Sequence, residues 1–170
     1  MISTKGRSLT TKRVHLPDLG QRGEGWVALQ VVLLITIVGA GFVGPLWTGP
    51  VRMVGAIVGA ALIAFGIGLV TAGILGLRRQ LTAYPRPVPG GRLIQNGAFG
   101  IVRHPMYGGG VIAALGWGVA MASPLALAGA LVLGVFFDLK SRREEAWLSE
   151  QFVGYAAYRR RTRRLIPWIC

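Results

Sequence analysis

The chain has 170 residues, of which 52% are hydrophobic and only 15% are charged, whereas an ordinary globular chain carries roughly 25% charged residues. A chain of this length suits one domain. The net charge of +13 would fit a nucleic-acid-binding domain, but long uncharged stretches argue against that class, and we expect no nucleic-acid partner. The composition instead indicates a membrane protein.

Residues 1–24 are polar and predict a tail ahead of a single domain over residues 25–170. No charged residue occurs in 25–51 or in 53–77. Because a helix needs about 20 apolar residues to cross a bilayer, these stretches predict two membrane-spanning helices, one over residues 26–47 and one over residues 53–77. The second contains glycines that would let a neighbouring helix approach closely: Gly55, Gly59, Gly66, Gly73 and Gly76.

The uncharged stretch over residues 105–137 is too long for one helix. Ser123-Pro124 interrupts it, and proline both lacks an N–H and disfavours helix in the residue before it. We therefore expect a helical hairpin with arms 107–122 and 124–139, each about 24 Å long. That length is short for a full span, and the sequence leaves open whether the hairpin crosses the bilayer.

Residues 141–158 predict one amphipathic helix that lies on the membrane surface or caps the membrane bundle. The predicted fold class is therefore all-α: a polytopic membrane protein with about four transmembrane helices, the last two a short hairpin, and a C-terminal amphipathic helix. A basic, proline-rich loop over residues 78–103 connects the second and third helices.

The basic residues lie in three segments, namely the tail, the loop over residues 78–103 and the segment over residues 140–164, with Arg52 alone outside them. Cytoplasmic flanks of membrane helices are enriched in Lys and Arg. Four crossings place all three segments on one side of the bilayer. We therefore expect an integral, multi-pass protein with both termini in the cytoplasm and the lipid bilayer as its partner.

The first candidate site is the run Arg103-His104-Pro105-Met106-Tyr107. Pro105 suits the first helical position, which places His104 near the N-cap, where free N–H groups favour an anion. Three glycines follow, residues 108–110. Glycine in a helix costs about 1 kcal/mol relative to alanine, so something approaches closely there, either another helix or a ligand. An ordinary interfacial histidine beside glycines that merely pack is the alternative.

The second candidate site is the pair Glu144-Glu145. Neighbouring helical side chains point about 100° apart, so the two carboxylates do not address one ligand atom together. A helical wheel places Glu144 near the centre of the apolar arc and Glu145 at its edge. A carboxylate facing a membrane bundle is costly unless paired, so we expect Glu144 to pair with Arg103, His104 or a ligand ammonium. A structural salt bridge at the membrane surface is the alternative.

The segment over residues 93–108, with its Arg-His-Pro-x-Tyr box, resembles the cofactor motif of the isoprenylcysteine carboxyl methyltransferase and phospholipid methyltransferase family of integral membrane methyltransferases. The run over residues 144–158 and the segment 164–167 resemble its downstream motif, so the likeness covers about residues 85–167. It implies an S-adenosylmethionine-dependent methyltransferase. Its methyl acceptor would be lipid-like or small and apolar, a prenylcysteine carboxylate or a phospholipid, at the cytoplasmic face.

The resemblance also assigns expected roles to residues. The loop, the hairpin and the C-terminal helix would enclose S-adenosylmethionine, and one of the two adjacent glutamates would hold its ammonium or a hydroxyl group. Ser141 stands about where the prenylcysteine enzymes use an arginine towards substrate, so either Arg142 or Arg143 would substitute or the substrate would differ. No catalytic residue and no metal is assigned. The residues expected to contact the cofactor are Leu93, Ile94, Phe99, Arg103, His104, Pro105, Met106, Tyr107 and Glu144 or Glu145.

Two other functions remain open. NADPH-dependent membrane reductases of the sterol reductase type share an Arg-His-Pro-like box, but tend to carry an aspartate and a Lys-Tyr-Gly-x-x-Trp pattern where this chain has Glu144-Glu145 and the run 153–158. That difference favours the methyl donor. A non-catalytic membrane protein is the third possibility, against which the intact His104, Tyr107 and glutamate pair argue. The acceptor, the atom methylated and the oligomeric state stay undetermined.

Overall fold

The computed structural model describes residues 17, 19–44, 47–82 and 84–166, so the predicted tail over residues 1–24 lies mostly outside the described residues. The described part is helical, with one isolated bridge between Val102 and Arg163 and no strand. The prediction of an all-α fold is confirmed. The elements are α1 (Glu24–Ala40), α2 (Gly49–Leu77), the 3-10 turn η1 (Arg78–Gln80), α3 (Ala98–Ile101), α4 (Pro105–Ala120), α5 (Pro124–Gln151) and α6 (Tyr155–Arg161).

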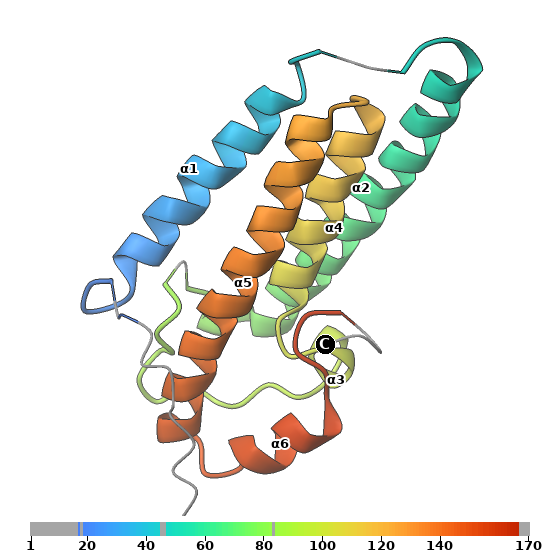
Figure 1. The fold of residues 1–170 in the computed structure, drawn as a ribbon. Coiled ribbons are helices and arrows are strands. Elements are labelled where there is room, and N and C mark those ends of the chain that lie inside the picture. The colour runs from blue at the N-terminus through green and yellow to red at the C-terminus, as the bar shows by residue number, and fades with distance from the viewer. Residues whose placement is uncertain (1–16, 18, 45–46, 83, 167–170) are drawn as a thin grey trace, which may run out of the picture.

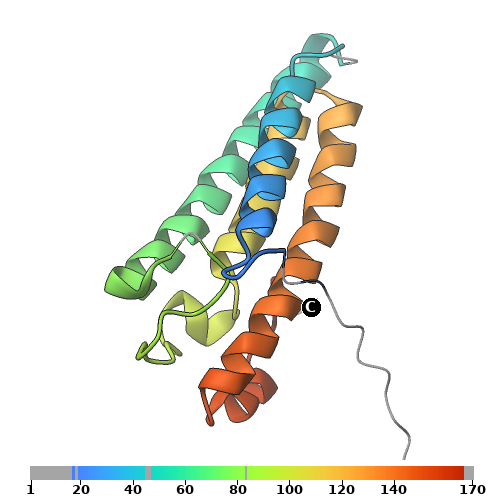
Figure 2. The same ribbon diagram turned by 90° about the vertical axis from the view of Figure 1, so that its left-hand side faces the viewer.

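Four long helices, α1, α2, α4 and α5, form a bundle (Figure 1). Helix α4 packs against both α2 and α5, and α1 packs mainly against α5. The view turned by 90° shows the same four helices running along one bundle axis (Figure 2). The short helices α3 and α6 lie together below one end of the bundle, so the residues of the predicted site gather at that end.

The ends of the first two helices differ from the sequence prediction. Helix α1 ends at Ala40, not at residue 47, and Gly44 in the glycine-rich stretch that follows has a φ of +61°, the left-handed region that a continuous right-handed helix does not adopt. Helix α2 begins at Gly49, four residues earlier than predicted, with a proline in its first turn. Proline fixes a helical φ and lacks the N–H that a first turn leaves unused.

The prediction of a separate amphipathic helix over residues 141–158 is wrong. Helix α5 runs without interruption from the bundle to Gln151, and the break follows at Phe152–Gly154, before α6. Neither glycine nor proline occurs between residues 135 and 153, so nothing there stops a helix. A change from apolar to polar composition marks where α5 leaves the apolar layer, and it does not mark a helix boundary.

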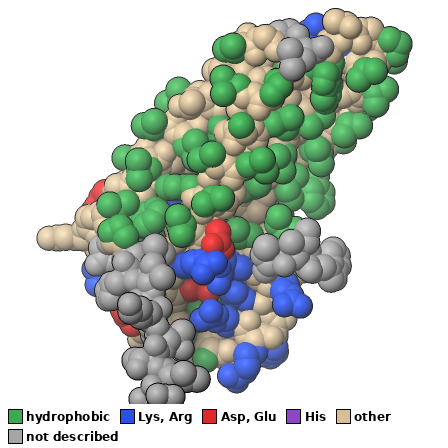
Figure 3. Space-filling view, in the orientation of Figure 1, with side chains coloured by type: hydrophobic (Ala, Val, Ile, Leu, Met, Phe, Trp, Pro, Cys, Tyr) green, Lys and Arg blue, Asp and Glu red, His purple; other side chains and the backbone are tan. Residues whose placement is uncertain are grey.

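Apolar side chains cover the outside of the bundle. Ile35, Phe65 and Leu131 are 67%, 64% and 65% exposed, and Phe65 points outward from α2. Figure 3 shows hydrophobic side chains over the upper bundle and Lys and Arg side chains gathered at the lower end. Soluble monomers rarely expose apolar patches of this extent. Helix α2 with η1, and α5, are long and apolar enough to cross a membrane.

Helices α2 and α4 touch backbone to backbone through two glycine pairs. A Cβ on Gly59 would lie 2.5 Å from the carbonyl oxygen of Gly116, and a Cβ on Gly116 would lie 2.7 Å from that of Gly59. Gly66 and Gly109 repeat the arrangement at 2.5 and 2.6 Å. The pairs are spaced seven residues apart on both antiparallel helices. The predicted close approach at Gly59 and Gly66 is thus confirmed, and we call these two pairs the glycine seam.

The seam gives a matched stability test on one helix. We expect Gly66→Ala to lower the stability of the purified protein by about 1–3 kcal/mol, because the new methyl group meets the backbone of α4. Gly68 has no atom within 4 Å of its Cβ position, so Gly68→Ala should leave the melting temperature unchanged or raise it. Thermal unfolding in detergent measures both, and equal melting temperatures would contradict the seam.

Candidate functional site

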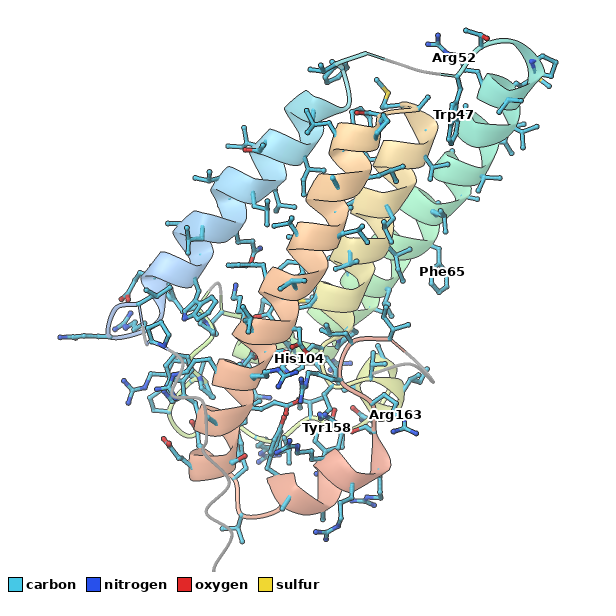
Figure 4. The ribbon with its side chains drawn as sticks, in the orientation of Figure 1. Trp47, Arg52, Phe65, His104, Tyr158 and Arg163 are labelled. Atoms are coloured by element: carbon cyan, nitrogen blue, oxygen red, sulfur yellow. The ribbon has the colours of Figure 1, made fainter. Side chains whose placement is uncertain are left out.

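The predicted box opens helix α4. His104 is the N-cap residue and Pro105 lies in the first turn, as the sequence indicates. The N–H groups of Arg103 and His104 donate to the carbonyl oxygens of Arg163 and Arg164, at 2.8 and 3.0 Å. Figure 4 shows His104 at the lower end of the bundle, with Arg163 nearby. The segment after α6 therefore lies alongside the box and holds its backbone in place.

Three glycines follow the box, and each faces a different neighbour. The Cβ position of Gly108 abuts the carbonyl oxygen of Leu165, that of Gly109 lies 2.6 Å from the carbonyl oxygen of Gly66, and that of Gly110 lies 3.2 Å from the ring of Phe137. The segment after α6, helix α2 and helix α5 thus enclose the start of α4 on three sides. Chain packing accounts for all three glycines.

A buried ion pair connects the box to α5. Arg103 Nε lies 2.7 Å from Glu145 Oε1, and the two side chains are 7% and 4% exposed. The Nη1 group of Arg103 also donates to the carbonyl oxygens of Arg159, at 3.1 Å, and of Thr162. Buried charges are tolerated when they are paired and hydrogen-bonded in this way. Arg103 therefore ties α5, α6 and the segment after α6 together.

Of the three partners expected for Glu144, namely Arg103, His104 or a ligand ammonium, Arg103 pairs with Glu145 instead. The helical wheel treated residues 141–158 as a helix on the membrane surface. In the structure, α6 and the segment after it fold back against the lower half of α5, and Glu145 is the carboxylate that they bury. Glu144 is 23% exposed and instead accepts a hydrogen bond from the hydroxyl of Tyr107, at 2.8 Å.

His104 lies between the two carboxylates. Its Nδ1 is 3.6 Å from Glu144 Oε2 and its Nε2 is 3.5 Å from Glu145 Oε1, both longer than a hydrogen bond to nitrogen. The buried Nε2 has no hydrogen-bond partner among the described residues. The Tyr107 ring stacks on His104 at 5.3 Å and on Phe137 at 4.6 Å between centroids. These contacts fix the orientation of Tyr107.

A pocket that is partly open to solvent lies beside these groups, with about 580 Å³ of empty space that includes its open mouth. Pro105 and Glu145 are buried but do not line the pocket, since Glu145 serves the ion pair with Arg103. The sequence-predicted residues that line it are Leu93, Ile94, Phe99, Arg103, His104, Met106, Tyr107 and Glu144.

Arg142 and Arg143, the residues expected to face the substrate, do not line the pocket. Arg142 is exposed and pairs with Asp138, with 2.6 Å between Nε and Oδ2. The guanidinium carbon of Arg143 lies 4.3 Å from the centroid of the Trp147 ring. Both side chains are therefore engaged on the surface of α5, away from the groups that surround His104.

Sequence reasoning missed a group of residues that complete the pocket. Leu77 is the last residue of α2, and Phe152 follows the last residue of α5. Tyr155 and Tyr158 belong to α6, which lies below the pocket. The spacing of the four residues between positions 148 and 158 is typical of one apolar helix face. Gly154 is the one local signal in the sequence for the turn at Phe152–Gly154. The missed residues are Leu77, Arg92, Leu148, Phe152, Tyr155 and Tyr158.

Lys140 was also missed, because the sequence assigned it to the basic cytoplasmic flank. It is 2% exposed, its Nζ donates to Gln30 Oε1 at 2.6 Å, and the same atom lies 5.2 Å from the centroid of the Tyr107 ring. An amide oxygen and an aromatic face both favour an ammonium group. Lys140 thus joins α1 to α5 next to the pocket.

Two tyrosines of α6 stay protonated at neutral pH. Burial raises the pKa of Tyr158 to about 12. Burial, together with the nearby Glu145 carboxylate, also raises the pKa of Tyr155 above its ordinary value. The Tyr158 hydroxyl donates to the carbonyl oxygen of Phe99 at 2.7 Å and so holds α3 to α6. Both phenols are therefore neutral hydrogen-bond donors, of which the Tyr158 hydroxyl is engaged by Phe99.

The lining combines an apolar part with one carboxylate, one imidazole, three phenols and two guanidinium groups. Such a pocket suits an organic ligand that has a flat apolar portion and a cationic group, because the Glu144 carboxylate attracts positive charge. Within the described residues, no three His, Cys, Asp or Glu side chains are placed to hold a metal ion.

The Arg103–Glu145 pair predicts a difference between two glutamates of α5. Glu145→Ala leaves Arg103 buried without its partner, so we expect the free energy of unfolding to fall by about 3–5 kcal/mol. Glu150 is exposed, and Glu150→Ala should change the free energy of unfolding by less than about 0.5 kcal/mol. Chemical denaturation in detergent checks both, and a small effect at Glu145 would show that the pair is not structural.

Comparison with known proteins agrees with this geometry. A search of the curated proteins finds no matching sequence. The family model of the phospholipid methyltransferases matches residues 54–154, more than half of the chain. The match begins in α2 and ends just before α6, so it contains the glycine seam, the box and both glutamates. The chain therefore belongs to the phospholipid methyltransferase family and is a membrane methyltransferase.

Proposed function

We propose that the pocket binds S-adenosylmethionine and that the protein methylates a lipid-like or small apolar acceptor at the cytoplasmic face of the membrane. The observation that carries the proposal is the placement of Glu144, Tyr107 and His104 on the wall of one pocket, next to apolar side chains. The methyl donor combines a flat adenine, a sulfonium and a zwitterionic amino-acid end. Each part has a chemically matching wall in this pocket.

The fit can be stated residue by residue. Leu93, Ile94 and Phe99 supply apolar surface for the adenine. The Tyr107 ring, held by its stacking contacts, borders the pocket with its hydroxyl on Glu144, and the Glu144 carboxylate attracts the positive charge of the sulfonium. Glu144 is the glutamate that we assign to the ammonium, because its carboxylate lines the pocket whereas Glu145 is committed to Arg103.

Bound S-adenosylmethionine would supply an electrophilic methyl group, to which a lone pair of the acceptor bonds while the methyl–sulfur bond breaks and its electron pair stays on sulfur. The protein contributes alignment and exclusion of water, which are large effects in such a displacement. Tyr107 is oriented by His104, Phe137 and Glu144 before any ligand arrives. An anionic acceptor needs no further help, whereas an amine acceptor must first lose a proton.

The cytoplasmic assignment rests on charge. The pocket lies at the lower end of the bundle, where Lys and Arg side chains gather (Figure 3). Arg52 lies at the opposite end (Figure 4). Cytoplasmic flanks are the basic ones, and a water-soluble donor enters from that side. Helices α1 and α4, with 17 and 16 residues, reach about 24–26 Å, so we infer four crossings of a locally thin bilayer with both termini cytoplasmic.

Calorimetry on the detergent-purified protein tests the cofactor. We expect S-adenosylmethionine to bind in the micromolar range and NADPH, offered in parallel, not to bind. Binding of NADPH without binding of the methyl donor by a folded sample would sink the proposal in favour of a membrane reductase.

A charge-matched pair of variants tests the assignment of Glu144. We expect Glu144→Gln to weaken binding of S-adenosylmethionine about 10- to 100-fold, which corresponds to loss of a charged hydrogen bond of about 1.5–3 kcal/mol. Glu150→Gln removes the same charge from an exposed position of α5 and should bind like the wild type. Undiminished binding by Glu144→Gln would remove Glu144 from the site.

A further inference from the structure

One polar group in the pocket wall has nothing to bond to. Tyr155 is 1% exposed and lines the pocket, and its hydroxyl has no hydrogen-bond partner within the described part of the chain. Buried polar groups are nearly always paired, and one that is not deserves an explanation. Because this hydroxyl belongs to a pocket-lining residue, a ligand is the natural partner.

Nearby protein groups do not supply the missing bond. Glu145 is paired with Arg103, and the Glu144 carboxylate accepts from Tyr107. The backbone of Tyr155 is anchored independently, since its N–H donates to the carbonyl oxygen of Phe152 at 3.0 Å. The ring is thus held by the turn before α6 and by burial, while its hydroxyl stays unused.

Tyr158 provides the contrast within the same helix. Its ring packs edge-on against that of Tyr155, with 5.9 Å between centroids, and it also lines the pocket. Its hydroxyl, however, donates to the carbonyl oxygen of Phe99. The Tyr158 hydroxyl therefore connects α6 to α3, whereas the Tyr155 hydroxyl remains free to donate to a ligand.

A second unpaired atom lies in the wall of the same pocket. His104 is 5% exposed and its Nε2 has no hydrogen-bond partner in the described ranges. That Nε2 atom lies 3.5 Å from Glu145 Oε1, and the Nδ1 atom lies 3.6 Å from Glu144 Oε2, so the imidazole faces the two carboxylates. The wall therefore offers the Glu144 carboxylate for a cation and the Tyr155 hydroxyl as a donor for an anion, which is the pattern that an amino-acid group requires.

We propose that the Tyr155 hydroxyl donates a hydrogen bond to the carboxylate of bound S-adenosylmethionine, beside the ammonium held by Glu144. The assignment rests on the proposed function. The ammonium and carboxylate of the donor are attached to one carbon, so a carboxylate must lie next to whatever group Glu144 holds. Tyr155 is then a specificity residue that distinguishes the intact amino-acid end from an end without a carboxylate.

Decarboxylated S-adenosylmethionine, which keeps the ammonium but lacks the carboxylate, gives the direct test. Calorimetry would measure both ligands against the wild type, Tyr155→Phe and Tyr158→Phe, with melting temperatures taken alongside. We expect Tyr155→Phe to bind S-adenosylmethionine about 10-fold more weakly and to bind the decarboxylated ligand like the wild type. Its melting temperature should stay equal or rise, because no protein hydrogen bond is lost.

Tyr158→Phe is the structural control. It loses the bond to Phe99 and should melt at a lower temperature, while the ratio of its affinities for the two ligands stays that of the wild type. Equal weakening of both ligands by Tyr155→Phe would overturn the assignment to the carboxylate. Wild-type binding by Tyr155→Phe would overturn it altogether. A wild-type protein that binds neither ligand would instead refute the proposed function itself.

Discussion

The buried contact between Arg103 and Glu145 is the interaction on which the lower half of the molecule depends. Arg103 precedes α4, Glu145 belongs to α5, and the same guanidinium reaches carbonyl oxygens at the end of α6. Removing charges from water is expensive, so such a pair persists only where further hydrogen bonds satisfy it. Here two carbonyl oxygens at the end of α6 do so, and they hold α6 in place under the pocket.

The glycine seam supplies the matching constraint from the other side. It fixes α4 against α2 at a distance that no side chain would permit, and the ion pair then fixes α5 and α6 relative to the start of α4. His104 and Tyr107 sit where the two constraints meet. Their rings and polar atoms are therefore set by the packing of the chain, and the pocket is preorganised, which lowers the ordering cost of binding.

Features that depend only on nearby residues could be predicted from the sequence, whereas features that depend on contacts between distant segments could not. The N-cap position of His104 depends on one proline, and the apolar helices depend on composition over about 20 residues, so these expectations survive. Whether Glu144 or Glu145 pairs with Arg103 depends on how α6 folds back against α5. A helical wheel describes one helix alone and does not include that contact. The same fold-back explains why Tyr155 and Tyr158 escaped notice.

The hydrogen bonds from Arg103 and His104 to the segment after α6 have a consequence for biogenesis. The four bundle helices precede residues 162–165 in the sequence, so the apolar bundle can insert into the bilayer before these residues dock. The walls of the pocket close only when the later segment docks beside the box. Membrane insertion and assembly of the binding site are thereby separate events, and a ligand that binds only the assembled site stabilises the docked segment by mass action.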